Sequence, residues 1–397
     1  MNKEKRRVPK LRFPGFTEDW EQRKLGAMCS LFTDGDWIES KDQSNEGIRL
    51  IQTGNIGVGK FIDKPENKKW ISHSTFDNLR CKELLDGDIL ISRLPHPAGR
   101  ACIVSTNNEK WITAVDCTIV RLLDRYSNKF ILQSLCTYNY FHLIDSFLAG
   151  GTRQRVSRSN LSDINIMSPE KIEQDKIGLF FECIDNLITL HQRKLEHLNL
   201  KKKALLQKLF PKNGECYPEL RFPGFTDAWE QRKLDDIARI KTGGGTPKTA
   251  NLEYWSGNIP WIQSSDLVEG DIVHVNINKF INNNALINSA AKLISRDSIT
   301  LVTRVGVGKV AVINQDFTTS QDFLSLSDFD GNNIKFLAYQ LYRLMQENAK
   351  VLQGTSIKGI TKTELIEQSI SIPSSNQEQN LIANVLSKID SIITLHQ

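Results

Sequence analysis

The sequence repeats itself, and this internal duplication constrains the fold more than any other feature. The stretch LRFPGFTEDWEQRKL at residues 11–25 returns as LRFPGFTDAWEQRKL at residues 220–234, with 13 of 15 positions identical. A second repeat pairs IDNLITLHQ at residues 184–192 with IDSIITLHQ at residues 389–397, with seven of nine positions identical. The two pairs are offset by 209 and 205 residues, so the sequence predicts one unit of about 200 residues written twice.

Length and composition bound the class of protein. A chain of 397 residues exceeds what one hydrophobic core usually supports, which agrees with two or more domains. Apolar runs such as residues 89–92 are far shorter than the roughly 20 residues that cross a bilayer, and no apolar segment follows the charged start MNKEKRRVPK. We therefore expect a soluble, cytoplasmic protein with no membrane partner. Its net charge of +5 fits a polyanionic ligand without requiring one.

Each unit is predicted to be an α+β domain followed by a long helix. Short β runs between turn residues precede a helical pattern in both copies: 48–52, 88–92, 101–105, 118–122 and then 129–149 in the first, and 261–263, 298–304, 309–313, 323–326 and then 334–352 in the second. The predicted organisation is a first head, a first long helix, a second head and a short second helix, at residues 1–168, 169–212, 213–373 and 374–397.

The first long helix carries the pattern of a coiled coil. Ser168 and Pro169 are predicted to start it, and Pro211 and Gly214 to stop it, which leaves about 40 residues or ~60 Å. Heptad positions are mostly apolar, which favours an antiparallel pairing of the two long helices and an internal pseudo-twofold. The predicted seam residues are Ile177, Phe181, Ile184, Ile188, His191, Leu195, Leu198, Leu205 and Leu209 in the first helix, and Ile382, Leu386, Ile389, Ile393 and His396 in the second.

Histidines occupy equivalent seam positions in the two helices. His191 and His396 suggest either a pH switch or a polar pair that fixes the register of the helices, and the pattern favours the register-setting pair.

The sequence contains no recognisable catalytic motif. Residues 306–311 fit G-x-G-x-x-A, but the following residues continue as a strand and favour a β-turn. The glycine-rich residues 241–248 lack the G-K-[ST] ending of a phosphate loop, and no Pro-Pro pair, H-E-x-x-H or G-x-S-x-G occurs. Seven cysteines and seven histidines show no metal-ligand spacing. We expect no catalytic residue, metal or cofactor in this chain.

Candidate DNA contacts lie in loops at matching places of the two copies. Arginine, lysine, glutamine and hydroxyl side chains reach phosphates and base edges, although a solvated loop is the alternative for each of them. The candidates of the first copy are Arg93, Arg100, Arg153, Gln154, Arg155 and Arg158. Those of the second copy are Lys241, Thr246, Lys248, Arg304, Lys309, Lys358 and Lys362.

Three motifs carry a resemblance to a known family. They are the opening L-R-F-P-G-F-x-x-x-W-E-x-x-K-L, the segment G-G-T-P followed by Y-W-S-G-N-I-P-W at residues 244–261, and the helix I-D-x-x-I-x-x-H-Q-R-K-L at residues 184–195. With these motifs the chain resembles, over essentially its whole length, the specificity subunits of type I restriction-modification systems.

The resemblance implies both a division of labour and a set of partners. Residues 1–168 and 213–373 would be target-recognition domains, each reading half of an interrupted site in double-stranded DNA, and the helices would fix the gap. Two methyltransferase subunits would dock on the helices, and restriction-translocase subunits would join them. S-adenosylmethionine, ATP and Mg²⁺ would belong to these partners.

One departure and two other classes of function remain open. The first helix continues past Gln192 with RKLEHLNLKKKALLQKLF at residues 193–210, whereas the second repeat stops at Gln397, so the late seam positions have no duplicate. The chain could instead be a coiled-coil scaffold whose two heads bind protein, or a catalytic subunit with a divergent site. Salt-sensitive, sequence-selective DNA binding separates the DNA-binding subunit from the scaffold, and activity of the pure chain would indicate an enzyme.

Overall fold

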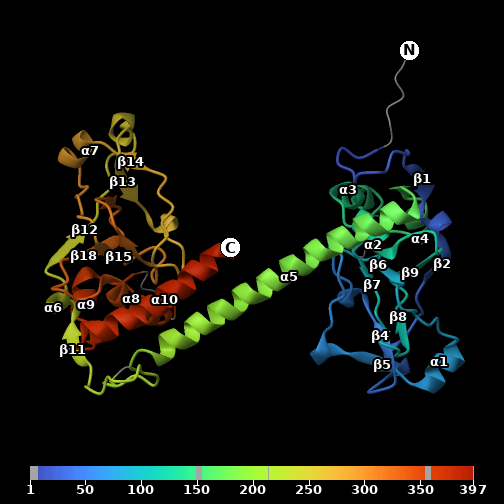
Figure 1. Ribbon diagram of the computed structural model, residues 1–397, viewed down its shortest axis with the longest axis horizontal. Helices are drawn as coiled ribbons and strands as arrows, with labels where there is room; N and C mark the ends of the chain where they lie inside the picture. The colour runs from blue at the N-terminus through green and yellow to red at the C-terminus, as the bar shows by residue number, and fades with distance from the viewer. Residues whose placement is uncertain (1–7, 149–153, 213, 354–358, 397) are drawn as a thin grey trace, which may run out of the picture. The chain divides into compact units, whose positions relative to one another are not determined.

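The computed structural model describes residues 8–148, 154–212, 214–353 and 359–396, and the chain divides into two compact units, Met1–Thr189 and Leu190–Gln397 (Figure 1). Both units contain mixed sheets and helices, which confirms the α+β prediction. The boundary lies inside helix α5 (Lys171–Lys208), whereas the sequence suggested a separate spacer over residues 169–212. The difference arises because each half of the helix packs against its own unit. Within the described residues, no helix is long and apolar enough to span a membrane.

Unit 1 is built on an antiparallel four-stranded sheet of order β2-β9-β6-β7. A second sheet, β3-β5-β4-β8, contains one parallel pair, and β1 pairs with β10. The strands are β1 (Glu21–Lys24), β2 (Cys29–Asp34), β3 (Gln43–Ser44), β4 (Ile48–Ile51), β5 (Lys69–Ile71), β6 (Ile89–Ser92), β7 (Ala101–Ile103), β8 (Trp111–Thr113), β9 (Cys117–Leu122) and β10 (Asn165–Ser168). Besides α5, the helices are α1 (His73–Leu79), α2 (Asn128–Ser134), α3 (Tyr138–Ser146) and α4 (Arg158–Ser162).

Unit 2 repeats this topology with the sheets β12-β18-β15-β16 and β14-β13-β17 and the pair β11-β19. Its strands are β11 (Glu230–Lys233), β12 (Ile240–Gly243), β13 (Ile259–Ile262), β14 (Phe280–Ile281), β15 (Ser298–Val302), β16 (Val310–Ile313), β17 (Thr318–Thr319), β18 (Phe323–Ser327) and β19 (Ser369–Ile372). Its helices are α6 (Leu234–Ile237), α7 (Asn283–Ile287), α8 (Ile334–Gln353), α9 (Lys362–Ile366) and α10 (Asn376–Leu395). The duplication in sequence is therefore a duplication of fold.

Two predicted helix boundaries were wrong. The pattern over residues 129–149 is two helices, because the Thr137 hydroxyl accepts a hydrogen bond from the Tyr140 N–H and so starts α3 anew. Ser168 does not cap α5, since it pairs with Glu21 in the β1–β10 ladder. The long helix therefore begins at Lys171, two residues after Pro169, which was predicted to be its first residue.

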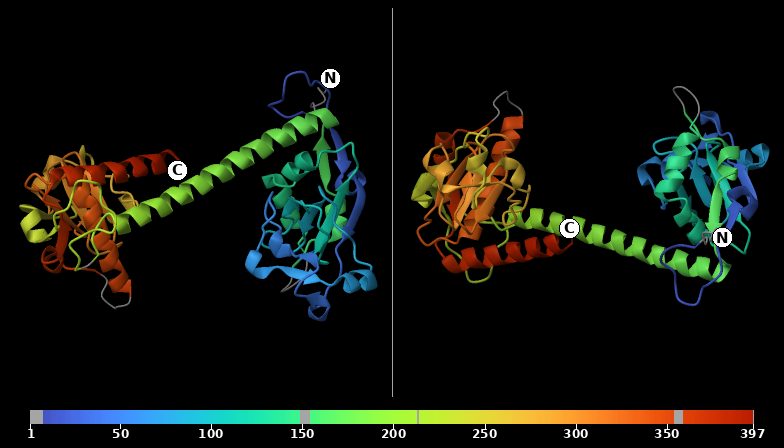
Figure 2. Two further views of the ribbon diagram at one scale, coloured as in Figure 1. Left: turned by 60° about the horizontal axis from the view of Figure 1, so that its bottom comes forward. Right: turned by 90° about the horizontal axis from the view of Figure 1, so that it is seen from above.

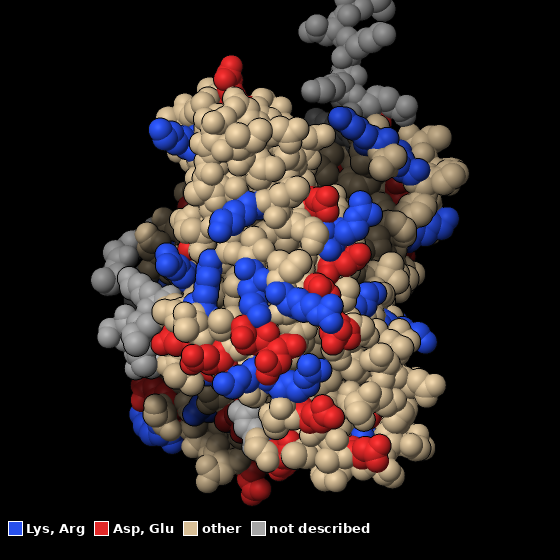
Figure 3. All heavy atoms as spheres, turned by 90° about the vertical axis from the view of Figure 1, so that its left-hand side faces the viewer, with Lys and Arg blue, Asp and Glu red and all other residues tan. Residues whose placement is uncertain are grey.

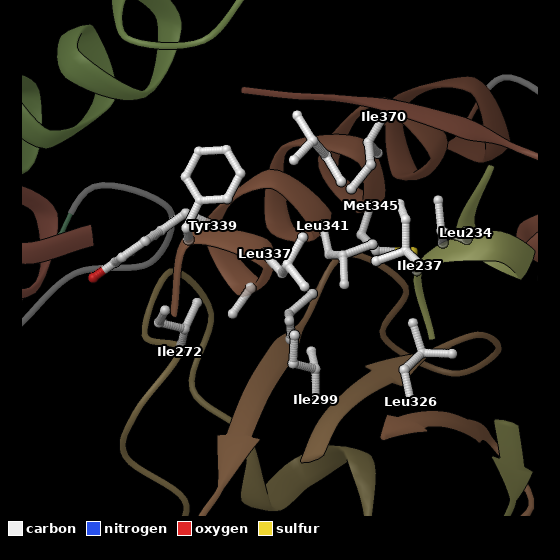
Figure 4. Close-up of a cluster of buried hydrophobic side chains, with 14 of the residues drawn as sticks. Leu234, Ile237, Ile272, Ile299, Leu326, Leu337, Tyr339, Leu341, Met345 and Ile370 are labelled. Atoms are coloured by element: carbon white, nitrogen blue, oxygen red, sulfur yellow. The ribbon is translucent and has the colours of Figure 1, made fainter. Parts of the chain in front are cut away.

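Helix α8 covers the main sheet of unit 2 and forms its core. Leu337, Leu341 and Met345 recur every four residues, so they share one face of the helix, and each is at most 2 % exposed. Figure 4 shows this face directed toward Ile299 of β15 and Leu326 of β18.

A buried ion pair fastens each repeated opening segment to the start of a long helix. The guanidinium of Arg12 donates to both carboxylate oxygens of Glu173 at 2.7 and 2.8 Å, and Arg221 donates to Glu378 at 2.8 and 2.9 Å. Both glutamates are at most 1 % exposed. The indole of Trp229 also donates to Glu378, at 3.3 Å. In each unit the repeated opening segment is thus held against the start of a long helix.

Within unit 2, α10 runs antiparallel to the second half of α5. The two helices lie side by side in Figures 1 and 2. His191 lies against His396 at the end of α10, whereas Lys202, farther along α5, forms an ion pair with Asp390, which precedes His396. The predicted seam residues Ile382, Leu386, Ile389 and Ile393 are all buried here. This part of the helix pair therefore has the predicted orientation.

The histidine pair predicts that unit 2 loses stability in mild acid. The two Nδ1 atoms lie 3.0 Å apart, and the pKa of His396 is lowered by its burial and then by the charges of Lys194 and His191. A lowered pKa means that the unfolded chain binds the proton more readily, so this contribution is complete above about pH 6.5 and is lost as the pH falls below it.

Thermal unfolding across this pH range tests the prediction. The melting temperature of the full chain should fall between about pH 7.5 and pH 5.5 because His396 then charges in the unfolded state. The variant His396→Gln should show a weaker decrease. An equally steep decrease in both proteins would show that the histidine pair does not contribute.

Candidate nucleic-acid interface

Three arginines of unit 1 converge on two aspartates at one end of the main sheet. Arg93 Nη1 lies 3.3 Å and Arg158 Nη1 lies 3.7 Å from the carboxylate of Asp34, the last residue of β2. Arg155 Nη1 lies 3.5 Å from the carboxylate of Asp116, which immediately precedes β9. The Arg155 and Arg158 side chains are 50 % exposed, so both can also reach an external ligand.

Two predicted arginines of unit 1, Arg93 and Arg100, are largely engaged by main-chain carbonyls. Arg93 is 8 % exposed and donates to the carbonyl of Val115. Arg100 donates to the carbonyls of Thr53, Ile56, Leu94 and Pro97 and to the Ser92 hydroxyl, and burial lowers its pKa. Gln154 is exposed, and Arg153 lies outside the described residues. The cations of Arg93 and Arg100 therefore hold the local turns together.

In unit 2 some of the predicted residues form hydrogen bonds or ion pairs within the unit, and others are exposed to solvent. Lys309 donates to the carbonyls of Ser264 and Leu267, and Lys241 forms an ion pair with Asp235 at 2.8 Å. Thr246 donates to the side chain of Gln321 at 2.6 Å. The exposed residues are Lys248, Arg304 and Lys362, and Lys358 lies outside the described part of the chain.

Charge alone does not mark an interface on unit 2. On the face that Figure 3 turns to the viewer, basic and acidic side chains alternate over the middle and lower parts, and the upper part is mostly uncharged. The net positive charge of the chain is therefore not gathered into one basic patch on this face. Among the described residues, no three histidine, cysteine or acidic side chains are placed to hold a metal ion.

Sequence reasoning missed the two aspartates and one lysine of these clusters. Asp34 and Thr118 are 84 residues apart, yet the β2–β9 register places them opposite each other, and the Thr118 hydroxyl donates to Asp34 at 2.8 Å. Lys292 lies near enough to Lys362 to lower its pKa. No local sequence pattern predicts the contacts of such residues, because these contacts depend on the pairing of strands that are distant in the sequence.

Unit 1 also exposes apolar side chains on the first half of α5. Leu179, Phe180, Phe181, Leu187 and Ile188 are 43 to 53 % exposed, and we call them the α5 apolar face. Phe180 and Phe181 line an apolar cavity of about 420 Å³ whose other walls include Pro9, Leu11, Phe13 and Trp20. Large exposed apolar side chains gathered on one segment are typical of interaction surfaces, so the α5 apolar face is a candidate partner surface.

Comparison with known proteins identifies a family. The family described as type I restriction modification DNA specificity domain matches residues 17–200 and again residues 226–397. A type I restriction enzyme specificity subunit of Methanocaldococcus jannaschii is 33 % identical over 171 residues, which cover 42 % of this chain and 38 % of the relative. Another, from Escherichia coli, is 26 % identical over 280 residues, which cover 67 % of this chain and 65 % of the relative. The matches thus span less than two thirds of either relative.

A solved structure supports the same fold. The crystal structure of the S subunit of a type I restriction-modification system from M. genitalium superposes with a TM-score of 0.63 at 13 % identity, covering 98 % of this chain and 94 % of that protein. At this identity the likeness shows the fold alone.

Proposed function

Because the chain belongs to the type I restriction modification DNA specificity family, we propose that it is the DNA-recognition subunit of a restriction-modification complex. Each unit would bind one half of an interrupted site in double-stranded DNA. The observation that carries this proposal is the duplicated unit. Each copy has basic side chains near the same end of its main sheet: Arg155 and Arg158 in unit 1, and Lys362 in unit 2.

The catalytic work would belong to partner subunits in the cytoplasm. We propose two adenine methyltransferase subunits, which bind S-adenosylmethionine, and restriction-translocase subunits, which use ATP and Mg²⁺. The α5 apolar face is our candidate docking surface for a methyltransferase subunit, because its half-exposed phenylalanines and leucines would gain about 25 cal/mol for each Å² buried. The chain itself would contribute recognition and no catalytic group.

DNA contact by unit 1 predicts the behaviour of an arginine variant. Replacing Arg155 and Arg158 with alanine should weaken DNA binding by the assembled complex. If the arginines bind phosphates, the slope of log affinity against log salt should fall by about 0.9 for each arginine replaced. If they bind bases, discrimination at the half-site of unit 1 should fall by about 1 to 3 kcal/mol for each arginine.

A matched variant controls for loss of charge alone. Replacing Arg296 and Lys335, two exposed cations of unit 2 that belong to neither group of candidate residues, removes the same charge and should change the affinity less. Equal effects of the two double variants on affinity, salt slope and sequence choice would contradict DNA binding at Arg155 and Arg158.

Selection from a random DNA library tests the proposed function itself. The chain, assembled with its methyltransferase subunits, should enrich duplexes that carry two short conserved blocks separated by a gap of fixed length. A coiled-coil scaffold with protein-binding heads would enrich no sequence. Methyl transfer or cleavage by the pure chain would instead identify an enzyme.

A further inference from the structure

Lys362 of unit 2 stands at the position that Arg158 holds in unit 1. Both are the first residue of a short helix, after a hydroxyl residue that caps the helix. Two residues before each cation, a main-chain N–H donates across to the end of the sheet: Val156 to the Arg93 carbonyl at 3.1 Å, and Ile360 to the Thr303 carbonyl at 2.9 Å. These hydrogen bonds show that Arg158 and Lys362 are structurally equivalent, without any use of sequence identity.

One of the two counter-charges of unit 1, the carboxylate of Asp34, has no equivalent in unit 2. Asp34 ends β2 opposite Thr118 of β9, and Gly243 ends β12 opposite Leu324 of β18. A second pair of hydrogen bonds supports this alignment. In unit 1 the Arg93 N–H donates to the main-chain carbonyl of the aspartate two residues before Thr118. In unit 2 the Thr303 N–H donates to the main-chain carbonyl of the aspartate two residues before Leu324. A glycine therefore replaces the carboxylate that Arg93 and Arg158 share.

The lysine ammonium occupies the space that this glycine leaves. A Cβ atom added at Gly243 would overlap Lys362 Nζ. Burial lowers the pKa of Lys362, and the charges of Lys292 and Arg304 lower it further. None of these three cations forms an ion pair with a carboxylate among the residues that the structure describes. Three neighbouring positive charges without a counter-ion favour the binding of an anion.

We propose that Lys362, Arg304 and Lys292 bind a phosphate group of the DNA backbone, at the position where unit 1 carries its own carboxylate at Asp34. This inference rests on the proposed function and deepens it. In unit 1 the carboxylate of Asp34 competes with a phosphate for Arg158, whereas unit 2 has no carboxylate at this position. The two units therefore contribute unequally to the salt-dependent part of DNA binding.

Exchanging the counter-charge between the units provides the test. Gly243→Asp adds to unit 2 the carboxylate of unit 1, and only the flexible end of Lys362 has to move. Lys362→Gln removes the cation, and Asp34→Asn, the matched variant in unit 1, removes the internal counter-charge while it keeps an acceptor for Thr118. The probe is a duplex of random sequence, and its affinity for the assembled complex is measured from low to high salt.

The expected changes have opposite signs in the two units. Gly243→Asp and Lys362→Gln should each reduce the salt slope by about 0.9, and Asp34→Asn should increase it because Arg158 then binds a phosphate without competition from a carboxylate. On the full chain with ¹³C-methylated lysines, inorganic phosphate should raise the pKa of Lys362, and Gly243→Asp should raise it without phosphate.

The outcomes separate this site from the proposed function. An unchanged salt slope in folded Gly243→Asp and Lys362→Gln, together with no response of Lys362 to phosphate, would overturn the phosphate site even if the complex still selects a DNA sequence. Failure of the unaltered complex to select any sequence would overturn the proposed function, whatever the salt slope.

Discussion

A chain that carries four extra helix-forming residues between Thr189 and Leu190 is expected to direct methylation to sites whose two halves lie one or two base pairs farther apart. Helix α5 is continuous across this point, and four residues at 1.5 Å each lengthen it by about 6 Å, against about 3.4 Å for one base pair. Each half-site should keep its sequence, because the heads are unchanged.

The contacts of helix α5 on the two sides of Thr189 and Leu190 make this a suitable insertion point. On one side Asp185 accepts a hydrogen bond from Gln133 of unit 1, and on the other His191 contacts His396 of unit 2, so neither set of contacts is split. The same four residues inserted at the exposed turn after Asn107 are the control and should leave the gap unchanged. An active α5 variant with an unaltered gap would show that another element sets the spacing.

Replacing Arg221 with methionine is expected to lower the unfolding free energy of unit 2 by about 3 to 5 kcal/mol. Glu378 is 1 % exposed, and the loss of Arg221 leaves its carboxylate with the Trp229 indole as its only donor among the described residues. A buried charge without its partner is costly because it keeps its desolvation penalty and loses the attraction that offset it. Denaturant unfolding followed by tryptophan fluorescence measures the change.

A double variant distinguishes the ion pair from general disruption. Arg221→Met together with Glu378→Leu removes both charges and should recover much of the lost stability, since an apolar pair of similar volume often replaces a buried ion pair without cost. Arg12→Met is the matched change in unit 1 and should also destabilise its own unit, through Glu173. A loss below about 1 kcal/mol for Arg221→Met would place this pair among ordinary surface ion pairs.

Much of the fold could be predicted because its information is local or repeated. Apolar runs between turn residues located β6, β9, β15 and β18, and the duplicated segments indicated the two units. The break before α3 was missed, because a single capping hydroxyl at Thr137 decides it within an otherwise helical pattern. The Arg221–Glu378 pair was also missed, since its members are 157 residues apart and meet only in the folded unit.

The candidate site was predictable by residue type but not by the partners of each residue. Arginines in a predicted loop indicated a surface that binds a polyanion. The sequence around Arg158 does not predict its contact with Asp34, because the β2–β9 register determines where Asp34 lies. In the same way, the lysines of the second copy gave no sign that Lys309 donates to main-chain carbonyls. Which cations remain available to a ligand is a property of strand register and side-chain packing.

The most direct test of DNA recognition by this chain is to map methylated adenines in the genome of cells that contain the chain and its methyltransferase subunits. We predict methylation at one interrupted sequence with two different halves and a fixed gap, and no methylation of that sequence when the chain is deleted. Methylation at one uninterrupted sequence, or at the same sites without the chain, would contradict the proposed function.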